Sequence, residues 1–205
     1  RQAHHILPNE VPDGIEIWTY DKYDSDKYGI KLSECGGYLT SYIGEKREKE
    51  YDVMYVGKDK GRADEILSLQ KQFESMGLKT IFLIMPTTRT SAKKSFYSKP
   101  IPYEDVIELV TKSRAILNIA LPNQEGATLR DYESLFNEVK LITTNKNIKK
   151  FDFYNSNNIF ILAEDEMKDL PEFVRSSYEK IDDSIVNRYS LDVAIEEILQ
   201  ERGEV

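Results

Sequence analysis

The chain has 205 residues, 40% of them hydrophobic and 31% charged, and its 28 Lys and Arg against 36 Asp and Glu give a formal net charge of −8. This composition supplies a folded core and excludes a disordered, collagen-like or coiled-coil chain; the acidic balance also argues against nucleic acid as a partner, because phosphate backbones are bound by basic surfaces. One cysteine, Cys35, and two histidines, His4 and His5, argue against disulfides, metal sites and histidine-based triads. No apolar run approaches the roughly 18 residues that cross a bilayer, so we expect a cytoplasmic protein.

The first fifty residues are predicted to be a short strand and a connector. Residues 15–19 (IEIWT) favour a β-strand, and a polar, aspartate-rich stretch and two glycines, Gly36 and Gly37, follow. We therefore expect residues 1–50 to be the remnant of a preceding domain together with a connector, and residues 51–205 to form a separate domain. The first residue, Arg1 in place of an initiator Met, fits this expectation.

From residue 51 onward, apolar runs alternate with segments of helical periodicity. The runs cover residues 51–56, 79–85, 115–121, 140–143 and 159–162. Helices are predicted over residues 62–76, 103–112 and 129–137 and around residues 191–199, the last capped by Ser190. Strands that are apolar throughout and alternate with amphipathic helices indicate a parallel sheet covered on both faces. The predicted fold class is α/β, a doubly wound, Rossmann-like domain.

The loop after the first of these strands is rich in glycine and basic residues. It reads GKDKGR, with Gly57, Lys58, Lys60 and Arg62 just before a helix. Ligands of open parallel sheets lie beyond the carboxyl ends of the strands, where helix N–H groups and basic side chains suit a phosphate. The loop matches neither a Walker A nor a GxGxxG motif, so a tight, solvated turn is an equal alternative.

Two later segments carry further candidates. In EGATLRDYE, Glu125 lies in the loop after a strand, Gly126 allows close approach, and Thr128 is placed to cap the helix that carries Glu133. A carboxylate such as Glu133 can accept two hydrogen bonds from ribose hydroxyls, although Arg130, three residues earlier, makes a structural ion pair an alternative. In IPYE, the segment around Ile101 and Tyr103 is a candidate for contacting a nucleobase, with a helix start packed on the core as the alternative.

Several stretches together resemble a family of bacterial glycosyltransferase-like proteins with the GT-B fold, which act in lipopolysaccharide and capsular polysaccharide biosynthesis. The resemblance extends over residues 15–199. It rests on YDVMYVGKDKGR, IPYEDVIELVTKSRAILNI, EGATLRDYESLF and KLITTNKNIKKFDFYNSNNIFI, and WTYDKYDSDKYGIKL is similar to the connector between the two domains of such proteins. In GT-B enzymes the carboxy-terminal Rossmann-like domain binds the nucleotide-sugar donor, and many carry a Glu-x7-Glu motif.

The resemblance implies roles for the candidate residues. Glu125 would be catalytic and lie near the sugar, and Glu133 would hold the ribose. The donor diphosphate would be bound by Gly57, Lys58, Lys60, Arg62, Gly126, Ala127, Thr128 and Arg130, and the nucleobase by Ile101 and Tyr103. No cofactor or metal is implied, because the nucleoside diphosphate sugar is a substrate.

The predicted function is therefore the donor-binding half of a glycosyltransferase. It would transfer a sugar to a hydroxyl of a carbohydrate or lipid-linked acceptor, and membrane contact would be peripheral, through a missing domain. A non-catalytic interaction or nucleotide-binding module is the alternative, and a receiver-type domain is disfavoured because lysines replace the acidic residues expected after its first strand. The family tends to have a glycine after the Glu133 helix, which would favour a left-handed helix end, and here Asn137 is a residue that can also adopt this conformation.

Overall fold

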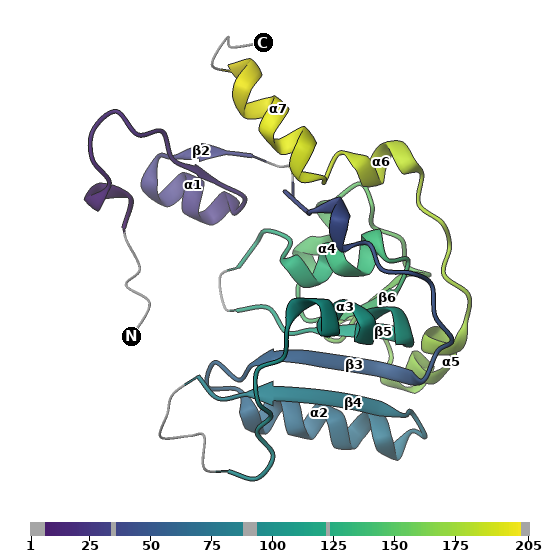
Figure 1. Cartoon of the computed structure of the whole chain (residues 1–205). Coiled ribbons are helices and arrows are strands. Elements are labelled where there is room, and N and C mark those ends of the chain that lie inside the picture. The colour runs from purple at the N-terminus through teal and green to yellow at the C-terminus, as the bar shows by residue number, and fades with distance from the viewer. Residues whose placement is uncertain (1–6, 34–35, 88–93, 122–123, 202–205) are drawn as a thin grey trace.

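The computed structural model describes residues 7–33, 36–87, 94–121 and 124–201. Three residues singled out in the sequence, His4, His5 and Cys35, lie outside these ranges. Within the described residues, the fold consists of a parallel sheet with helices on both faces and a smaller amino-terminal unit (Figure 1).

The main sheet confirms the predicted doubly wound α/β class. Its strands are β3 (Tyr51–Lys58), β4 (Thr80–Met85), β5 (Ser113–Asn118), β6 (Lys140–Thr143) and β7 (Ile159–Ile161). The spatial order is β4-β3-β5-β6-β7, and every neighbouring pair is parallel. The chain moves outward in one direction from β3 to β4 and in the other direction from β5 to β7, so the strand order reverses between β3 and β5. Such a reversal is the place where ligands bind in open α/β sheets.

Helices cover both faces because alternate residues of each strand point to opposite sides. The helices that follow β3 in the chain are α2 (Ala63–Ser75), α3 (Tyr103–Lys112), α4 (Leu129–Phe136), α5 (Leu170–Arg175), α6 (Asp183–Asn187) and α7 (Leu191–Glu201). On β3, Val53 and Tyr55 pack in one apolar cluster with residues of α2 and α5, whereas Met54 and Val56 pack with α3 on the other face. Leu141 of β6 extends this second face toward α4.

The amino-terminal unit contains a helix that the sequence pattern did not predict. Strand β1 (Trp18–Thr19) pairs in parallel with β2 (Lys31–Leu32), and α1 (Lys22–Tyr28) connects them. Helix α1 falls in the polar stretch expected to be a connector; it is capped by Asp21 and ends at Gly29, whose φ of 65° is left-handed. Figure 1 shows this unit set apart from the main sheet. Its contact with α7 includes a hydrogen bond of 2.7 Å from Ser33 Oγ to Glu197 Oε2.

Short helical turns connect the strands and helices, and a left-handed residue follows α4. The 3₁₀ turns are η1 (Pro8–Glu10), η2 (Thr40–Tyr42), η4 (Lys146–Lys150) and η5 (Met167–Asp169). Asn137 does not adopt the left-handed conformation that is open to it: its φ is −98°, and the left-handed residue at this helix end is Glu138, with φ 52°. The Asn137 side chain instead accepts a hydrogen bond from Gly44 N (2.8 Å) and donates one to Glu133 O (2.9 Å), and these bonds fix its place at the helix end.

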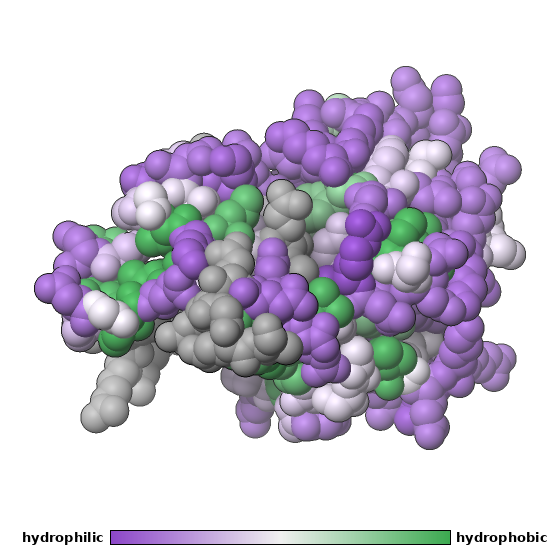
Figure 2. Space-filling view, turned by 90° about the horizontal axis from the view of Figure 1, so that it is seen from above, coloured by the Kyte–Doolittle hydropathy of each residue, from purple (hydrophilic) through white to green (hydrophobic). Residues whose placement is uncertain are grey.

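The molecular surface carries mainly hydrophilic residues on the face seen in Figure 2, with hydrophobic ones interspersed. In the described part of the chain, no helix has both the length and the apolar character needed to cross a membrane.

Candidate functional site

The sequence-predicted loops meet at one edge of the main sheet. Because all five strands are parallel, the loops that follow β3, β5 and β6 leave from the same edge. The structure thus brings the GKDKGR loop and the EGATLRDYE segment to the strand-order reversal between β3 and β5.

The loop after β3 is held in shape by a buried carboxylate. Asp59 is 5% exposed and accepts hydrogen bonds from Thr87 N (2.9 Å), from Thr87 Oγ1 and from Tyr97 Oη (2.5 Å). Burial by itself raises the pKa of Asp59, but the bonds from Thr87 and Tyr97 bring it below its ordinary value. Gly57 and Lys58, expected in the loop, are the last two residues of β3. With Asp59 turned inward, the side chains of Lys58 at the strand end and of Lys60 in the loop are exposed.

Arg62 points away from solvent toward the end of β5. Its Nη1 donates to Ile119 O (2.9 Å) and Ala120 O (2.8 Å). Carbonyl groups beyond the end of β5 therefore engage this guanidinium and tie the loop after β3 to the loop after β5.

Helix α4 begins with a reciprocal cap, as the sequence predicted for Thr128. Thr128 Oγ1 accepts from Arg130 N (3.2 Å), and Asp131 Oδ2 accepts from Thr128 N (2.6 Å). Asn118, the last residue of β5, donates to Asp131 Oδ1 at 2.8 Å. Burial raises the pKa of Asp131 to about 6, despite these hydrogen bonds.

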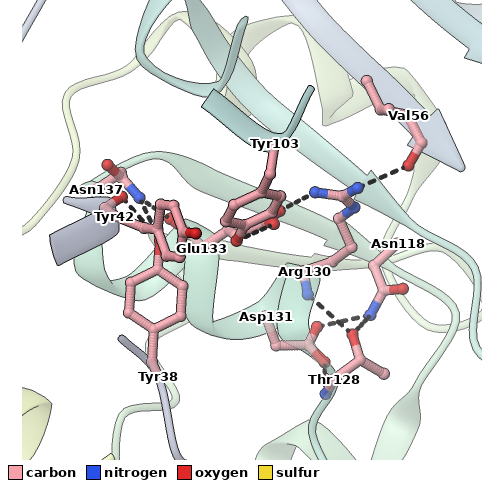
Figure 3. A network of polar contacts seen from close by, with 10 residues as sticks. All are labelled: Tyr38, Tyr42, Val56, Tyr103, Asn118, Thr128, Arg130, Asp131, Glu133 and Asn137. Atoms are coloured by element: carbon pink, nitrogen blue, oxygen red, sulfur yellow. Dashed lines mark hydrogen bonds and ion pairs between the residues drawn. The ribbon is translucent and has the colours of Figure 1, made fainter. Parts of the chain in front are cut away.

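The second glutamate of the Glu-x7-Glu motif is fully buried in a polar network (Figure 3). Glu133 Oε1 accepts from Tyr103 Oη at 2.8 Å, and Oε2 forms an ion pair with Arg130. Arg130 also donates to Val56 O at 2.9 Å, so it spans from α4 to β3. Burial raises the pKa of Glu133, and the Arg130 charge and the Tyr103 hydroxyl partly offset this effect. The alternative reading of Arg130 and Glu133 as an ion pair is confirmed.

A residue that the sequence analysis missed, Asp21, reaches the first glutamate of the motif. Asp21 Oδ1 caps α1 by accepting from Tyr23 N (2.9 Å), and Oδ2 accepts from both Glu125 N and Gly126 N (3.2 Å each). The approach is close: a Cβ on Gly126 would lie 2.7 Å from Tyr20 O. The available signal was an aspartate directly before a short segment that ends in glycine, which is a helix cap at both ends.

A cavity of about 410 Å³ lies between the amino-terminal unit and the loops after β5 and β6. It is lined by Tyr20, Lys22, Leu32, Glu125, Gly126, Lys150, Phe151, Asp152 and Tyr189. Of the predicted site residues, only Glu125 and Gly126 are among them. Ala127 is buried in the apolar cluster beneath α4, and Ile101 and Tyr103 pack on the cluster beneath α3.

The predicted site residues therefore form separate groups. Lys58 and Lys60 are exposed at the end of β3 and just beyond it. Arg62, Arg130 and Glu133 are bound to protein partners, and Glu125 and Gly126 face the cavity. Among the described residues, no group of His, Cys, Asp and Glu side chains is placed to hold a metal ion.

Comparisons with known proteins give structural matches only. No family model and no curated protein sequence matches the chain. The solved structures that resemble it include AviGT4, a glycosyltransferase involved in avilamycin A biosynthesis, with a TM-score of 0.63 and 9% identity over 90% of this chain. They also include the T4 phage protein BGT in complex with its UDP-glucose substrate, with a TM-score of 0.53 and 16% identity over 77% of this chain.

These likenesses are informative at the level of fold. This chain spans 62% of the AviGT4 chain and 51% of the T4 phage chain, so it corresponds to part of each. Identities this low carry over the architecture and leave open the activity. The chain has a GT-B glycosyltransferase-like fold.

Proposed function

We propose that this chain is the donor-binding half of a glycosyltransferase, which transfers a sugar from a nucleoside diphosphate sugar to an acceptor hydroxyl. The main observation in support is that the exposed Lys58 and Lys60 and the cavity-lining Glu125 lie at one edge of the sheet, where the strand order reverses. The fold shared with two glycosyltransferases, one solved with UDP-glucose, supports the same proposal.

The diphosphate would lie over the loop after β3. The ammonium groups of Lys58 and Lys60 would neutralise it, and the N–H groups at the start of α2 would add to the attraction. Charge that develops on the departing diphosphate would be stabilised by these groups, so the transfer would proceed by electrostatic stabilisation without a metal.

The ribose would be held by Glu133 through an exchange of partners. The Tyr103 hydroxyl now occupies Oε1 of Glu133, while Arg130 occupies Oε2. A ribose hydroxyl would take the place of the Tyr103 hydroxyl, because both are neutral donors to the same oxygen. Tyr103, once released, and Ile101 would then line the nucleobase.

The wider setting of the reaction comes from the sequence resemblance. We place the transfer in envelope polysaccharide synthesis at the cytoplasmic side of the membrane, with a carbohydrate or lipid-linked acceptor. Because the chain spans about half to two thirds of the glycosyltransferases it resembles, a further domain would contribute to the acceptor site and to membrane contact.

Calorimetric titration with UDP, GDP and UDP-glucose tests donor binding directly. We expect Lys58→Ala and Lys60→Ala each to weaken binding of the preferred nucleotide about three- to tenfold, since each removes one charge-assisted contact to phosphate. Lys71→Ala is the matched control, because Lys71 is an exposed lysine on α2. The absence of binding by the unmodified chain, or an equal loss in the control, would refute the proposal.

A non-catalytic module is a second candidate, and a specific observation favours it. Groups of this protein already occupy the motif region: Asp21 accepts from the backbone amides of Glu125 and Gly126, and Tyr103 and Arg130 bind the carboxylate of Glu133. If these contacts are permanent, neither the unmodified chain nor Asp21→Asn will bind nucleotides. If they yield to the donor, Asp21→Asn will bind at least as tightly as the unmodified chain.

A further inference from the structure

The cavity between the amino-terminal unit and the main sheet has groups that the donor proposal does not use. Its volume of about 410 Å³ lies within the range of small-molecule sites. Its walls come from distant parts of the chain, including Tyr20, Glu125 and residues 150–152. We propose that this cavity binds a neutral saccharide ring.

Aromatic side chains supply surfaces for the apolar faces of a sugar ring. Tyr20 is 53% exposed, and Phe151 and Tyr189 also line the cavity. Phe151 is held by its neighbours, with ring centroids 5.3 Å from Phe153 and 6.4 Å from Tyr189. Aromatic rings combine an apolar face with a fixed orientation, and the C–H face of a pyranose packs on such a surface without losing hydrogen bonds to its hydroxyls.

A fixed carboxylate lies beside these rings. Asp152 Oδ1 accepts from Tyr189 Oη at 2.6 Å, and Oδ2 forms an ion pair with Arg188. A carboxylate has about four acceptor positions, so these two partners orient Asp152 and leave positions for sugar hydroxyls. Such a group binds polyhydroxylated ligands with little ordering cost.

The remaining charges of the cavity balance each other. Lys22 is paired with Asp26 at 2.5 Å, and Asp152 is paired with Arg188. Within the described part of the chain, the Glu125 carboxylate and the Lys150 ammonium have no hydrogen-bond or ion-pair partner. One free negative and one free positive group suit hydroxyls, which both donate and accept, better than a charged substituent, which would be repelled by one of the two.

Backbone geometry argues further against a phosphate in this cavity. The consecutive amides of Glu125 and Gly126 would make an anion-binding pair at its wall, but Asp21 Oδ2 accepts from both. An incoming phosphate would meet this carboxylate instead of free N–H groups. The exposed Lys58 and Lys60 are absent from the lining, so the cavity is separate from the proposed diphosphate position.

In the proposed transfer, this ligand would be the acceptor, with Glu125 next to its hydroxyls. That identification rests on the proposed function, whereas the binding of a saccharide does not. Saccharide binding in the cavity and donor binding are therefore tested with different ligands.

Ligand-observed NMR with methyl glucoside, methyl galactoside and maltose tests the cavity, with glucuronate and inorganic pyrophosphate as charged probes. We expect at least one neutral sugar to bind in the millimolar range. Tyr20→Ala and Asp152→Asn should each weaken it by about fivefold or more, since they remove a stacking face and a charged acceptor. Tyr28→Ala is the matched control, because Tyr28 is an exposed tyrosine at the other end of α1 and does not line the cavity; it should leave the affinity within about twofold.

Three outcomes would overturn the assignment: no neutral sugar binding up to about 50 mM, equal losses in Tyr20→Ala and Tyr28→Ala, or a charged probe that binds as tightly as the neutral sugars. A UDP titration of Tyr20→Ala separates the two proposals, because UDP affinity should equal that of the unmodified chain. Sugar binding without UDP binding would support the cavity assignment and contradict the donor proposal.

Discussion

Two buried carboxylates on α4, two residues apart, are stabilised in different ways. Asp131 is satisfied by neutral donors, the Asn118 amide and the Thr128 N–H, whereas Glu133 faces the Arg130 charge. Burial raises the pKa of both groups. The difference in partners means that the proton binding of Asp131 and the ion pair of Glu133 can be tested separately.

Asp131 should make the protein less stable as the pH rises from about 4 to 6. Its pKa rises from 3.8 to about 6 on folding, so the folded state binds more protons than the unfolded state in that interval. The free energy of unfolding then falls with rising pH, by up to about 3 kcal/mol for this group alone. Urea unfolding at pH 4 and pH 7 should show this decrease in the free energy of unfolding in the unmodified chain and not in Asp131→Asn. If the free energy of unfolding changes with pH in the same way in both proteins, the predicted contribution of Asp131 is contradicted.

Removing the Glu133 carboxylate should strongly destabilise the protein. Glu133→Ala leaves Arg130 without its ion pair and Tyr103 without its acceptor. We therefore expect the free energy of unfolding to fall by about 3 kcal/mol or more. Tyr103→Phe should lose only about 1 kcal/mol, since Arg130 still pairs with the carboxylate. Glu108→Ala, which removes an exposed partner of Lys112, should leave the free energy of unfolding nearly unchanged. Urea unfolding measures all three, and equal losses for Glu133→Ala and Glu108→Ala would disprove the buried pair.

At the scale of elements, hydrophobic periodicity located the five strands of the main sheet and helices α2, α3, α4 and α7, and it missed the short helices α5 and α6. Helix α3 has the predicted bounds of 103–112, and α2 lies within the predicted 62–76. Hydrophobic periodicity did not predict helix α1, because its sequence, KYDSDKY, has no apolar stripe and none of its residues is buried. It is defined by its ends, Asp21 and Gly29, and by the tertiary contacts of Asp21, which no local pattern reveals.

Asp21 should couple α1 to the loop after β5. Asp21→Ala removes a helix cap and the hydrogen bonds from the amides of Glu125 and Gly126. We expect the free energy of unfolding to fall by about 1–3 kcal/mol and hydrogen exchange to become faster at both amides. Asp182→Ala is the matched control, because Asp182 caps α6 through Ser184 N and Ser184 Oγ. Hydrogen exchange followed by mass spectrometry compares the two. Unchanged exchange at residues 125–126 in Asp21→Ala would show that the contact is unimportant in solution.

At the scale of the whole molecule, the sequence predicted which loops meet but not how their side chains are used. Alternating strands and helices predict parallel strands whose carboxyl ends share one edge, so the meeting of residues 57–62 and 125–133 at that edge was predictable, whereas the strand order was not. The partners of Glu133 and the cavity around Phe151 were not, because they depend on side chains that come from distant parts of the chain. The amino-terminal unit closes one side of that cavity, so the shape of the cavity depends on how this unit is attached to the main sheet.

Gly126 is the point at which this attachment can be broken without disturbing the sheet. A Cβ at residue 126 would lie 2.7 Å from Tyr20 O, a backbone atom, so Gly126→Ala must push the amino-terminal unit away. We expect hydrogen exchange to rise across residues 18–32 while the strands of the main sheet keep their protection. Gly29→Ala perturbs the same unit through its left-handed φ but meets no atom within 4 Å, so it should loosen α1 alone and leave residues 125–126 unaffected. If Gly126→Ala instead exchanges like the unmodified chain, the unit does not rest on this loop in solution, and the cavity between them does not persist.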